Sequence, residues 1–143
     1  MKTLITILIM TMMINLITQA QTDKVAVEQL VNQFAKAGDQ RDVAQLKNLL
    51  HDDFRLAMNR LFGSEKVDLL GKEAYLKLVE EGKLGGDSRT VKILSIDITQ
   101  NNAAAKVALK GKALTFESYY QLVKNATGQW QLINDLPFAT KNQ

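Results

Sequence analysis

The chain has 143 residues, a formal net charge of +3, one histidine, one proline and no cysteine, a composition typical of a single soluble domain. The absence of cysteine excludes disulfide scaffolds, cysteine nucleophiles and iron–sulfur clusters, and one histidine cannot form a multi-histidine metal site. We therefore expect neither a metal ion nor another cofactor. The 18 basic and 15 acidic side chains nearly balance, which argues against nucleic acid as the main partner, because phosphate binding depends on clustered Lys and Arg.

The first twenty residues have the features of an export signal. Lys2 precedes a mostly apolar run over residues 4–17, and the segment Thr18-Gln19-Ala20 suits a signal peptidase. The run is shorter than the roughly 20 apolar residues of a membrane helix. We predict that residues 1–20 are a cleaved signal peptide, that residues 21–143 form one secreted or periplasmic domain, and that no membrane span remains after cleavage. The alternative is an uncleaved N-terminal anchor.

Three helices are predicted in the first half of the mature chain. The first follows apolar residues at the spacing of one helix face and ends near Gly38; these residues are Val27, Leu30, Val31 and Phe34. Asp42 is a suitable cap for a short second helix over residues 43–50. The third helix covers residues 72–81 and is stopped by Gly82.

Strands are expected between the second and third helices and again after residue 89. Phe54, Leu56 and Met58 alternate with more polar residues, which indicates a strand. A hairpin with the turn Asn101-Asn102 pairs Gln100 with Ala103 and brings Asp97 opposite Lys106. In that register, one face carries the apolar side chains of both strands, namely Leu94, Ile96, Ile98, Ala105, Val107 and Leu109.

The last two strands are connected by a three-residue loop, residues 126–128, with Gly128 in the left-handed conformation and Asn125 paired with Gln129. This register separates two faces. The inner face carries Phe116, Ser118, Tyr120, Leu122, Trp130, Leu132, Asn134 and Leu136. The outer face carries Glu117, Tyr119, Gln121, Val123, Gln131, Ile133 and Asp135.

Helices followed by a strand meander predict an α+β domain, with helices on one face of a curved antiparallel sheet. The segments Leu50-His51-Asp52-Asp53-Phe54, Phe116-Glu117-Ser118-Tyr119-Tyr120-Gln121-Leu122 and Gly128-Gln129-Trp130-Gln131-Leu132 make the chain similar to the nuclear transport factor 2-like superfamily, within it to the putative lumazine-binding branch. The resemblance implies a cone-shaped sheet wrapped around three helices, a pocket at its open end, and commonly a homodimer through the outer sheet face. In that branch we expect aspartate where Ser118 stands, and a basic residue at Asp135.

Five residues are candidates for ligand binding. Trp130 and Tyr120 suit stacking on a flat heteroaromatic or small apolar molecule, Ser118 and Asn134 suit its orientation, and Met58 supplies an adaptable wall. The alternative is that Trp130 and Tyr120 belong to the core.

We predict that the exported protein binds a small molecule in a pocket between the helices and the curved sheet. The alternatives are a dimeric module that docks a protein on its sheet face and an isomerase-like or cyclase-like enzyme. Catalysis requires a buried carboxylate beside Tyr120; because Asp97, Glu117 and Asp135 are expected outside, we assign no catalytic residue. The sequence favours His51 as a residue that caps the end of the second helix; the alternative is a general base oriented by Asp52. Apolar side chains on the outer face predict a symmetric dimer; they are Tyr119, Val123 and Ile133.

Overall fold

The computed structural model describes the backbone of residues 2–142 and the side chains of residues 18–142. The side chains of predicted leader residues 1–17 therefore lie outside the described part. Three helices are present: α1 (Lys2–Gln40), α2 (Val43–Leu49) and α3 (Lys72–Glu80). The six strands are β1 (Leu50–Asn59), β2 (Val67–Gly71), β3 (Thr90–Thr99), β4 (Asn102–Lys110), β5 (Leu114–Lys124) and β6 (Trp130–Lys141).

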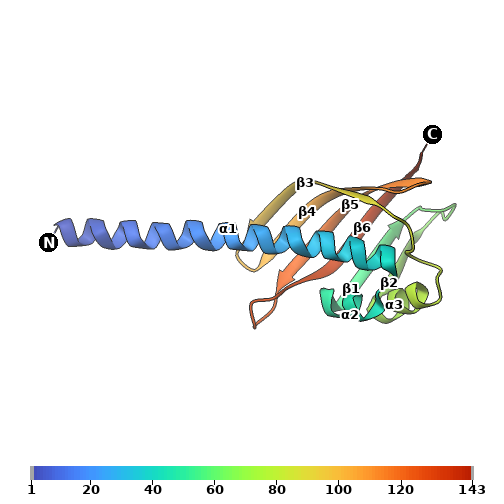
Figure 1. Cartoon of the computed structure of the whole chain (residues 1–143), viewed down its shortest axis with the longest axis horizontal. Coiled ribbons are helices and arrows are strands. Elements are labelled where there is room, and N and C mark those ends of the chain that lie inside the picture. Colours follow the sequence, from blue (N-terminus) through green and yellow to red (C-terminus); the bar gives the residue numbers. More distant parts are fainter. Residues whose placement is uncertain (1, 143) are drawn as a thin grey trace.

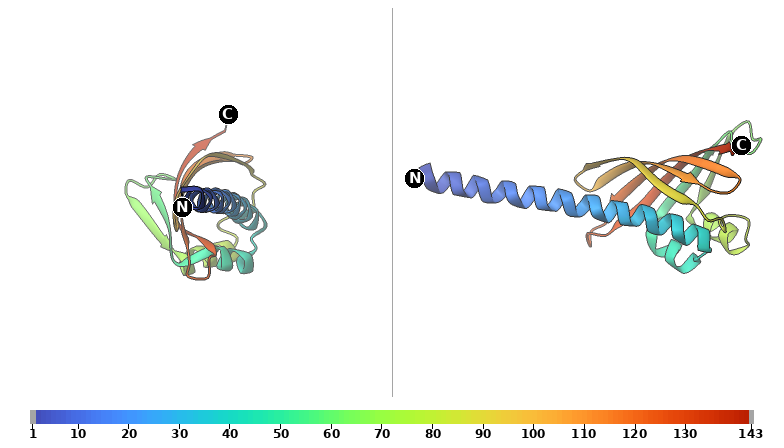
Figure 2. Two further views of the ribbon diagram at one scale, coloured as in Figure 1. Left: turned by 90° about the vertical axis from the view of Figure 1, so that its left-hand side faces the viewer. Right: turned by 45° about the horizontal axis from the view of Figure 1, so that its top comes forward.

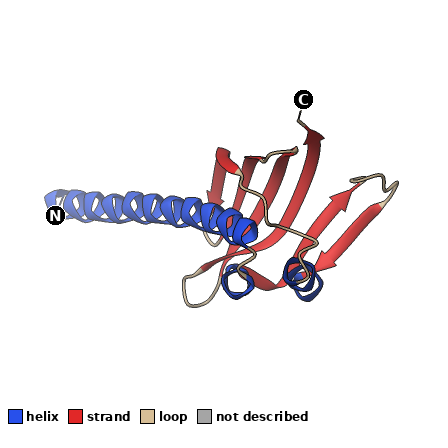
Figure 3. Ribbon diagram, turned by 45° about the vertical axis from the view of Figure 1, so that its right-hand side comes forward, coloured by secondary structure: helices blue, strands red, loops and turns tan. Residues whose placement is uncertain are grey.

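The strands form one curved, unclosed sheet in the order β2-β1-β6-β5-β4-β3, which bends around the second half of α1 (Figures 1 and 2). The predicted α+β class and its three helices are confirmed. The sheet is mixed rather than wholly antiparallel, because β1 runs parallel to β6. Helices α2 and α3 lie beside one end of the sheet (Figure 3). Among the residues described, no helix has both the length and the apolar character of a membrane span.

Helix α1 is one continuous element whose first half extends away from the sheet (Figure 1). Its second half buries the predicted apolar stripe against the concave face; this stripe is Val27, Leu30, Val31 and Phe34. The helix passes Gly38 and ends at Gln40, because Arg41 takes a left-handed conformation with φ of 54°. Asp42 then caps α2 as predicted, accepting the backbone N–H of Gln45 at 2.9 Å.

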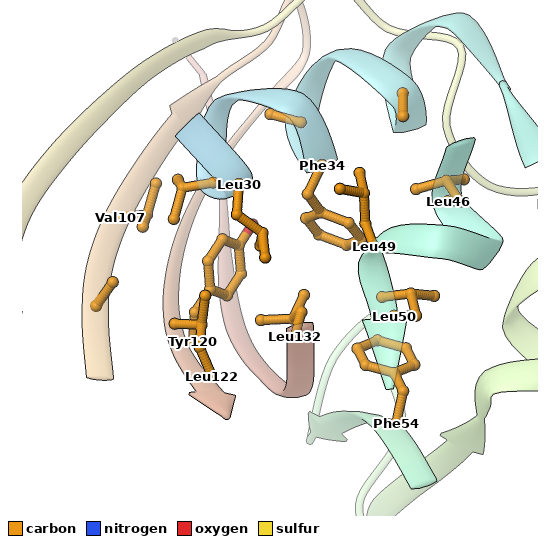
Figure 4. Close-up of a cluster of buried hydrophobic side chains, with 14 of the residues drawn as sticks. Leu30, Phe34, Leu46, Leu49, Leu50, Phe54, Val107, Tyr120, Leu122 and Leu132 are labelled. Carbon is orange, nitrogen blue, oxygen red and sulfur yellow. The ribbon is translucent and has the colours of Figure 1, made fainter. Parts of the chain in front are cut away.

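The core fills the space between α1, α2 and the concave side of the sheet. Phe34 from α1 lies beside Tyr120 from β5, and Leu50 and Phe54 extend the cluster along β1 (Figure 4). The rings of Phe34 and Tyr120 meet edge to face, with centroids 5.7 Å apart. This ring pair lies within a core whose other fully buried side chains are mostly Leu and Val, and edge-to-face contact is a favourable arrangement for two aromatic rings.

The hairpin of β3 and β4 forms with a different register from the predicted one. Thr99 pairs with Asn102 and Ile98 with Ala103, so the loop is Gln100-Asn101 and the residue with positive φ is Gln100. An irregularity between Ile93 and Ser95 leaves Leu94 exposed on the outer face. The expected inward position of Leu94 is therefore wrong.

The same register change separates the charges that the sequence placed together. Asp97 pairs with Ala104 rather than Lys106, and the Lys106 ammonium lies 3.5 Å from Glu117 on the next strand. The predicted pairing of Asp97 with Lys106 is therefore wrong.

The hairpin of β5 and β6 keeps the predicted register only beside its loop. Gly128 is left-handed with φ of 85°, the N–H of Asn125 donates to the carbonyl of Gln129 at 2.9 Å, and Leu122 pairs with Leu132. The next pair is Gln121 with Asn134, so Ile133 is an extra residue in β6. A bulge of one residue reverses the faces of all positions beyond it.

The bulge corrects the predicted faces of β6. Asp135 is buried on the concave side at 8% exposure, opposite Tyr120. Asn134 and Leu136 turn to the outer side, where Leu136 is exposed. The prediction of an inward Asn134 and Leu136 and an outward Asp135 is therefore wrong.

Strand β2 was not predicted from the sequence. It pairs antiparallel with β1, from Arg55 opposite Gly71 to Asn59 opposite Val67. Its Val67 and Leu69 side chains are exposed. The alternation of apolar and polar residues that marks a half-buried strand is therefore missing from this segment. Pairing with β1 along the sheet edge, rather than burial, defines this strand.

Candidate functional site

A cavity of about 250 Å³ opens between the concave face of the sheet, the end of α1, α3 and the segment before β3. Most of its lining is apolar and comes from elements far apart in the sequence. These apolar residues are Phe34, Leu56, Met58, Leu61, Phe62, Leu84, Leu109, Ala113, Leu114, Phe116 and Pro137. An apolar cavity with a few polar groups is the usual composition of a small-molecule site.

Polar groups gather where β5 and β6 meet inside the cavity. Tyr120 and Ser118 come from β5, Asp135 from the bulged part of β6, and Tyr75 from α3. Tyr120 and Ser118 are each only 1% exposed. The Tyr120 hydroxyl and Asp135 Oδ1 have no hydrogen-bond partner among the described residues. Buried groups of this kind are uncommon in folded proteins, so each one needs an explanation.

Burial determines the protonation of this polar end. It raises the pKa of Asp135 to about 7, against the opposing effects of a Ser118 hydrogen bond and the Arg89 charge. Burial also raises the pKa of Tyr120 well above its ordinary value, and the Asp135 charge adds to the effect. The pKa of Tyr75 is raised for the same two reasons. Asp135 can therefore gain or lose a proton near neutral pH, whereas both tyrosines keep theirs.

Arg89 lines the same cavity but its guanidinium is already occupied. Its Nε donates to Asp39 Oδ1 at 2.5 Å and its Nη2 to the carbonyl oxygen of Ala35 at 3.1 Å. The backbone N–H of Arg89 donates to the second oxygen of Asp39 at 2.9 Å. This ion pair joins the segment just before β3 to the end of α1, and among the described residues Asp135 forms no ion pair.

One wall of the cavity is a glycine-rich segment, residues 82–89, which Arg41 holds in place. The Arg41 side chain donates to the carbonyl oxygens of Gly82, Leu84 and Gly85 at 3.1–3.2 Å. A Cβ at Gly85 would collide with a backbone oxygen of α1. Since Gly85 also has a φ of 71°, glycine is required there both for conformation and for the close approach of the two segments.

An exposed aromatic ring stands at the mouth of the cavity. Phe62 lines the opening yet is 68% exposed, and it lies in the loop between β1 and β2 with a left-handed φ of 53°. Arg60 and Gly63 in this loop also have positive φ. The loop therefore presents an apolar side chain to solvent beside an apolar opening.

The structure brings three of the five predicted ligand residues together. Ser118, Tyr120 and Met58 all line the cavity. Asn134 lies on the outer face, beside Tyr119 and Leu136. Whether any of these residues binds a ligand stays a prediction.

Trp130 lies outside the cavity, near the point where α1 leaves the domain. Its indole N–H donates to Asp23 Oδ1 at 3.2 Å, and the Lys124 ammonium lies 2.6 Å from the same oxygen. Although burial opposes it, hydrogen bonds from Lys124, Trp130 and Gln19 hold the pKa of Asp23 below its ordinary value. These contacts connect residues at opposite ends of the chain and form a structural cluster.

Sequence reasoning missed Asp135, Tyr75 and Arg89 as cavity residues. The bulge at Ile133 hid Asp135, and no local pattern brings α3 or the start of β3 to the site. Ser118 and Asp135, the two departures from the expected family pattern, both face this polar end.

His51 does not line the cavity: its Nδ1 accepts the backbone N–H of Asp53 at 3.1 Å. Within the described residues, no group of three or more His, Asp or Glu side chains is placed to hold a metal ion.

A family profile described as putative lumazine-binding matches residues 22–136. The chain belongs to this putative lumazine-binding family. The match covers the segment from the buried half of α1 to the cavity-facing part of β6. No curated protein matches the sequence.

Solved structures share the fold of this member of the putative lumazine-binding family. An NTF2-like protein of unknown function from Silicibacter pomeroyi has a TM-score of 0.74 at 13% identity, over 85% of this chain and 98% of its own. An NTF2-like protein from Cytophaga hutchinsonii has a TM-score of 0.66 at 20% identity, over 82% and 98%. A ketosteroid isomerase-like protein from Erwinia carotovora has a TM-score of 0.65 at 15% identity, over 83% and 95%. These likenesses identify the fold as NTF2-like.

Proposed function

We propose that the protein binds one small, largely apolar molecule in this cavity. The observation that carries the proposal is the pair of unpartnered groups at its buried end, Asp135 Oδ1 and the Tyr120 hydroxyl. Leaving a buried polar group unsatisfied costs about 1–3 kcal/mol. A bound molecule with one polar substituent satisfies both groups, while its apolar part fills the rest of the cavity. The family description supports a small-molecule ligand.

The direct test is mass spectrometry of the protein as recovered from its own cells, first under native and then under denaturing conditions. We expect a stoichiometric small molecule that is released on denaturation. Tyr120→Phe removes one hydroxyl with little change in volume and is expected to weaken binding by about 1–2 kcal/mol. Tyr119→Phe is the matched control, because Tyr119 is the neighbouring residue on β5 but is 54% exposed on the outer face.

The proposal fails if no molecule is retained and none of a broad set of small apolar compounds raises the melting temperature of the protein. It also fails if Tyr119→Phe weakens binding as much as Tyr120→Phe, because the ligand then lies outside the cavity.

A second candidate is proton transfer on a bound carbonyl compound, in the manner of an isomerase or cyclase. A carboxyl group whose pKa burial raises to about 7 is matched to acid–base chemistry at neutral pH, and the Tyr120 hydroxyl is a donor for a developing oxyanion. The likeness to a ketosteroid isomerase-like protein supports this candidate. In D₂O, exchange of the ligand's C–H beside its carbonyl, seen by NMR and abolished in Asp135→Asn, is the expected sign. Binding without exchange leaves plain binding as the function.

The outer sheet face is proposed to form a symmetric homodimer, the alternative being a docking surface for another protein. Leu94, Tyr119, Leu136 and Phe138 are exposed there, Phe138 at 65%. Apolar area of this kind on one sheet face is typical of an interface. Light scattering at micromolar concentration is expected to give the mass of two chains; a monomer that binds a different envelope protein favours docking.

Export is also proposed, with cleavage after Ala20 and a secreted or periplasmic mature domain. The family match begins at residue 22, and the cluster of Asp23, Lys124 and Trp130 ties α1 to the sheet just after the cleavage point. The intact mass of protein from the envelope fraction tests this, since a retained leader identifies an uncleaved anchor.

A further inference from the structure

We infer that the ligand of this cavity is a small organic cation, an apolar ring whose short side chain carries one protonated amine. This inference rests on the proposed function and names its class of ligand. The first support is the charge of the lining. The charged lining residues are Asp87, Asp135 and Arg89, and Arg89 is neutralised by Asp39, which is 15% exposed. An anionic ligand meets two carboxylates and no unpaired cation, so the cavity selects against it.

The second support is the hydrogen-bonding pattern at the buried end. Asp135 Oδ1 is an unpartnered acceptor, and the Tyr120 and Ser118 hydroxyl oxygens can each accept as well. An ammonium group has three donors and no acceptor. It can therefore satisfy Asp135 and still donate to a hydroxyl oxygen. A neutral alcohol has a single donor and leaves the carboxylate charge without compensation.

The third support is the set of aromatic rings in the lining. Phe34 lies 5.7 Å from Tyr120 and 6.2 Å from Tyr75, measured between ring centroids. All three line the cavity, together with Phe62 at the mouth. Ring faces attract cations through their quadrupole, and the attraction is stronger when the cation is desolvated. The walls therefore favour the same charge that Asp135 favours.

The volume of the cavity limits the size of the ligand. An apolar cavity of about 150 Å³ is large enough for benzene, so about 250 Å³ holds one ring with a short side chain. An inorganic cation is a poorer occupant: the described residues offer no cluster of three metal-binding side chains, and one carboxylate does not replace a full hydration shell.

The pH dependence follows from the groups that face Asp135. They are Tyr75 from α3, Tyr120 and Ser118 from β5, and Arg89 from the segment before β3, with Asp39 of α1 paired to Arg89; Asp87 is the remaining charged residue of the lining. Burial raises the pKa of Asp135 to about 7, while an aliphatic ammonium stays protonated up to about pH 10. The ionised fraction of Asp135 grows about tenfold from pH 6 to pH 8, and affinity for the cation should grow by the same factor.

The experiment uses three probes that share a phenyl ring with a short side chain and differ in charge. They are the cation 2-phenylethylamine, the neutral 2-phenylethanol and the anion phenylacetate, with ammonium chloride as the inorganic control. Calorimetry on the full chain at pH 8 should give the amine at least about tenfold tighter binding than the alcohol, with no binding of phenylacetate. Asp135→Asn should remove the advantage of the amine, so that the amine binds no more tightly than the alcohol. Asp97→Asn, which removes an exposed carboxylate from the outer face of the same sheet, should change neither.

A measurement on the unmodified protein removes any dependence on how the variant folds. The carboxyl carbon resonance of Asp135 should titrate at lower pH in the presence of saturating amine, by about one pH unit or more. If 2-phenylethanol or phenylacetate binds as tightly as the amine, or if Asp135→Asn leaves amine binding intact, the inference is wrong while small-molecule binding stands. If none of the three probes binds at millimolar concentration, the inference is wrong; the proposed function fails only if, in addition, no molecule is retained from the cells and no compound of the broad set raises the melting temperature.

Discussion

Replacing Asp135 with Asn should change how the stability of the protein depends on pH. In the unfolded chain this carboxyl ionises near 3.8, whereas in the folded protein burial raises its pKa to about 7. Between these values the folded protein holds one proton more than the unfolded chain, so the free energy of unfolding falls as pH rises. The slope is about 1.4 kcal/mol per pH unit, or about 4 kcal/mol over the whole interval. This stability is fully present below about pH 4 and lost above about pH 7.

Urea unfolding of the full chain and of Asp135→Asn, from pH 4 to pH 8.5, measures the effect. The asparagine amide is itself a buried polar group, but its cost does not depend on pH, so the difference between the two proteins isolates the carboxyl. We expect the variant to gain stability relative to the unmodified protein as pH rises to about 7, and the difference then to level off. If the free energies of unfolding of the two proteins differ by a constant amount over this range, Asp135 is not a buried, unpaired carboxyl group. Asp97→Asn serves as the exposed control and should follow the unmodified protein.

Three further predictions concern parts of the fold around the site. Trp130→Phe removes the hydrogen bond to Asp23 and should cost about 1–2 kcal/mol in urea unfolding; an unchanged midpoint means that the indole N–H contributes nothing. Gly85→Ala should cost more than about 2 kcal/mol, since it adds a collision with α1 to the strain of positive φ, whereas Gly63→Ala, at a φ of 86° in open space, should cost about 1 kcal/mol. Equal costs would show that the close approach at Gly85 is absent. Phe138→Glu should convert the proposed dimer to a monomer in light scattering while the melting temperature of the domain is kept; a persistent dimer assigns the interface elsewhere.

The sequence predicted the fold because its signals are local. The apolar stripe of α1, the Asp42 cap and the Gly128 turn each follow from neighbouring residues, and each is present in the structure. Period-two alternation also indicated which residues of β5 face inward, and Tyr120 is buried as that pattern requires.

The candidate site was only partly predictable, because its geometry depends on bulges. In β6 the residues Leu132 and Ile133 are both apolar, so alternation fits a strand with or without an extra residue at Ile133. The regular strand placed Asn134 inside; the bulged one places Asp135 there. A second irregularity, at Leu94, arises in the same way. Arg89 and Tyr75 reach the cavity through long-range packing, which no local pattern encodes.

The parallel pairing of β1 with β6 bears on the order in which the molecule can form during synthesis. Strand β1 is made early, but its partner on one side is the last strand of the chain. The contacts of Asp23 likewise form only after Lys124 and Trp130 have been synthesised. Contacts of such wide sequence separation slow folding, because the intervening chain must be ordered first. A nascent chain that lacks β6 has an unpaired β1 edge and no Asp135, so β1 and β2 cannot join the sheet of β3, β4 and β5, and the cavity is incomplete, until β6 has left the ribosome.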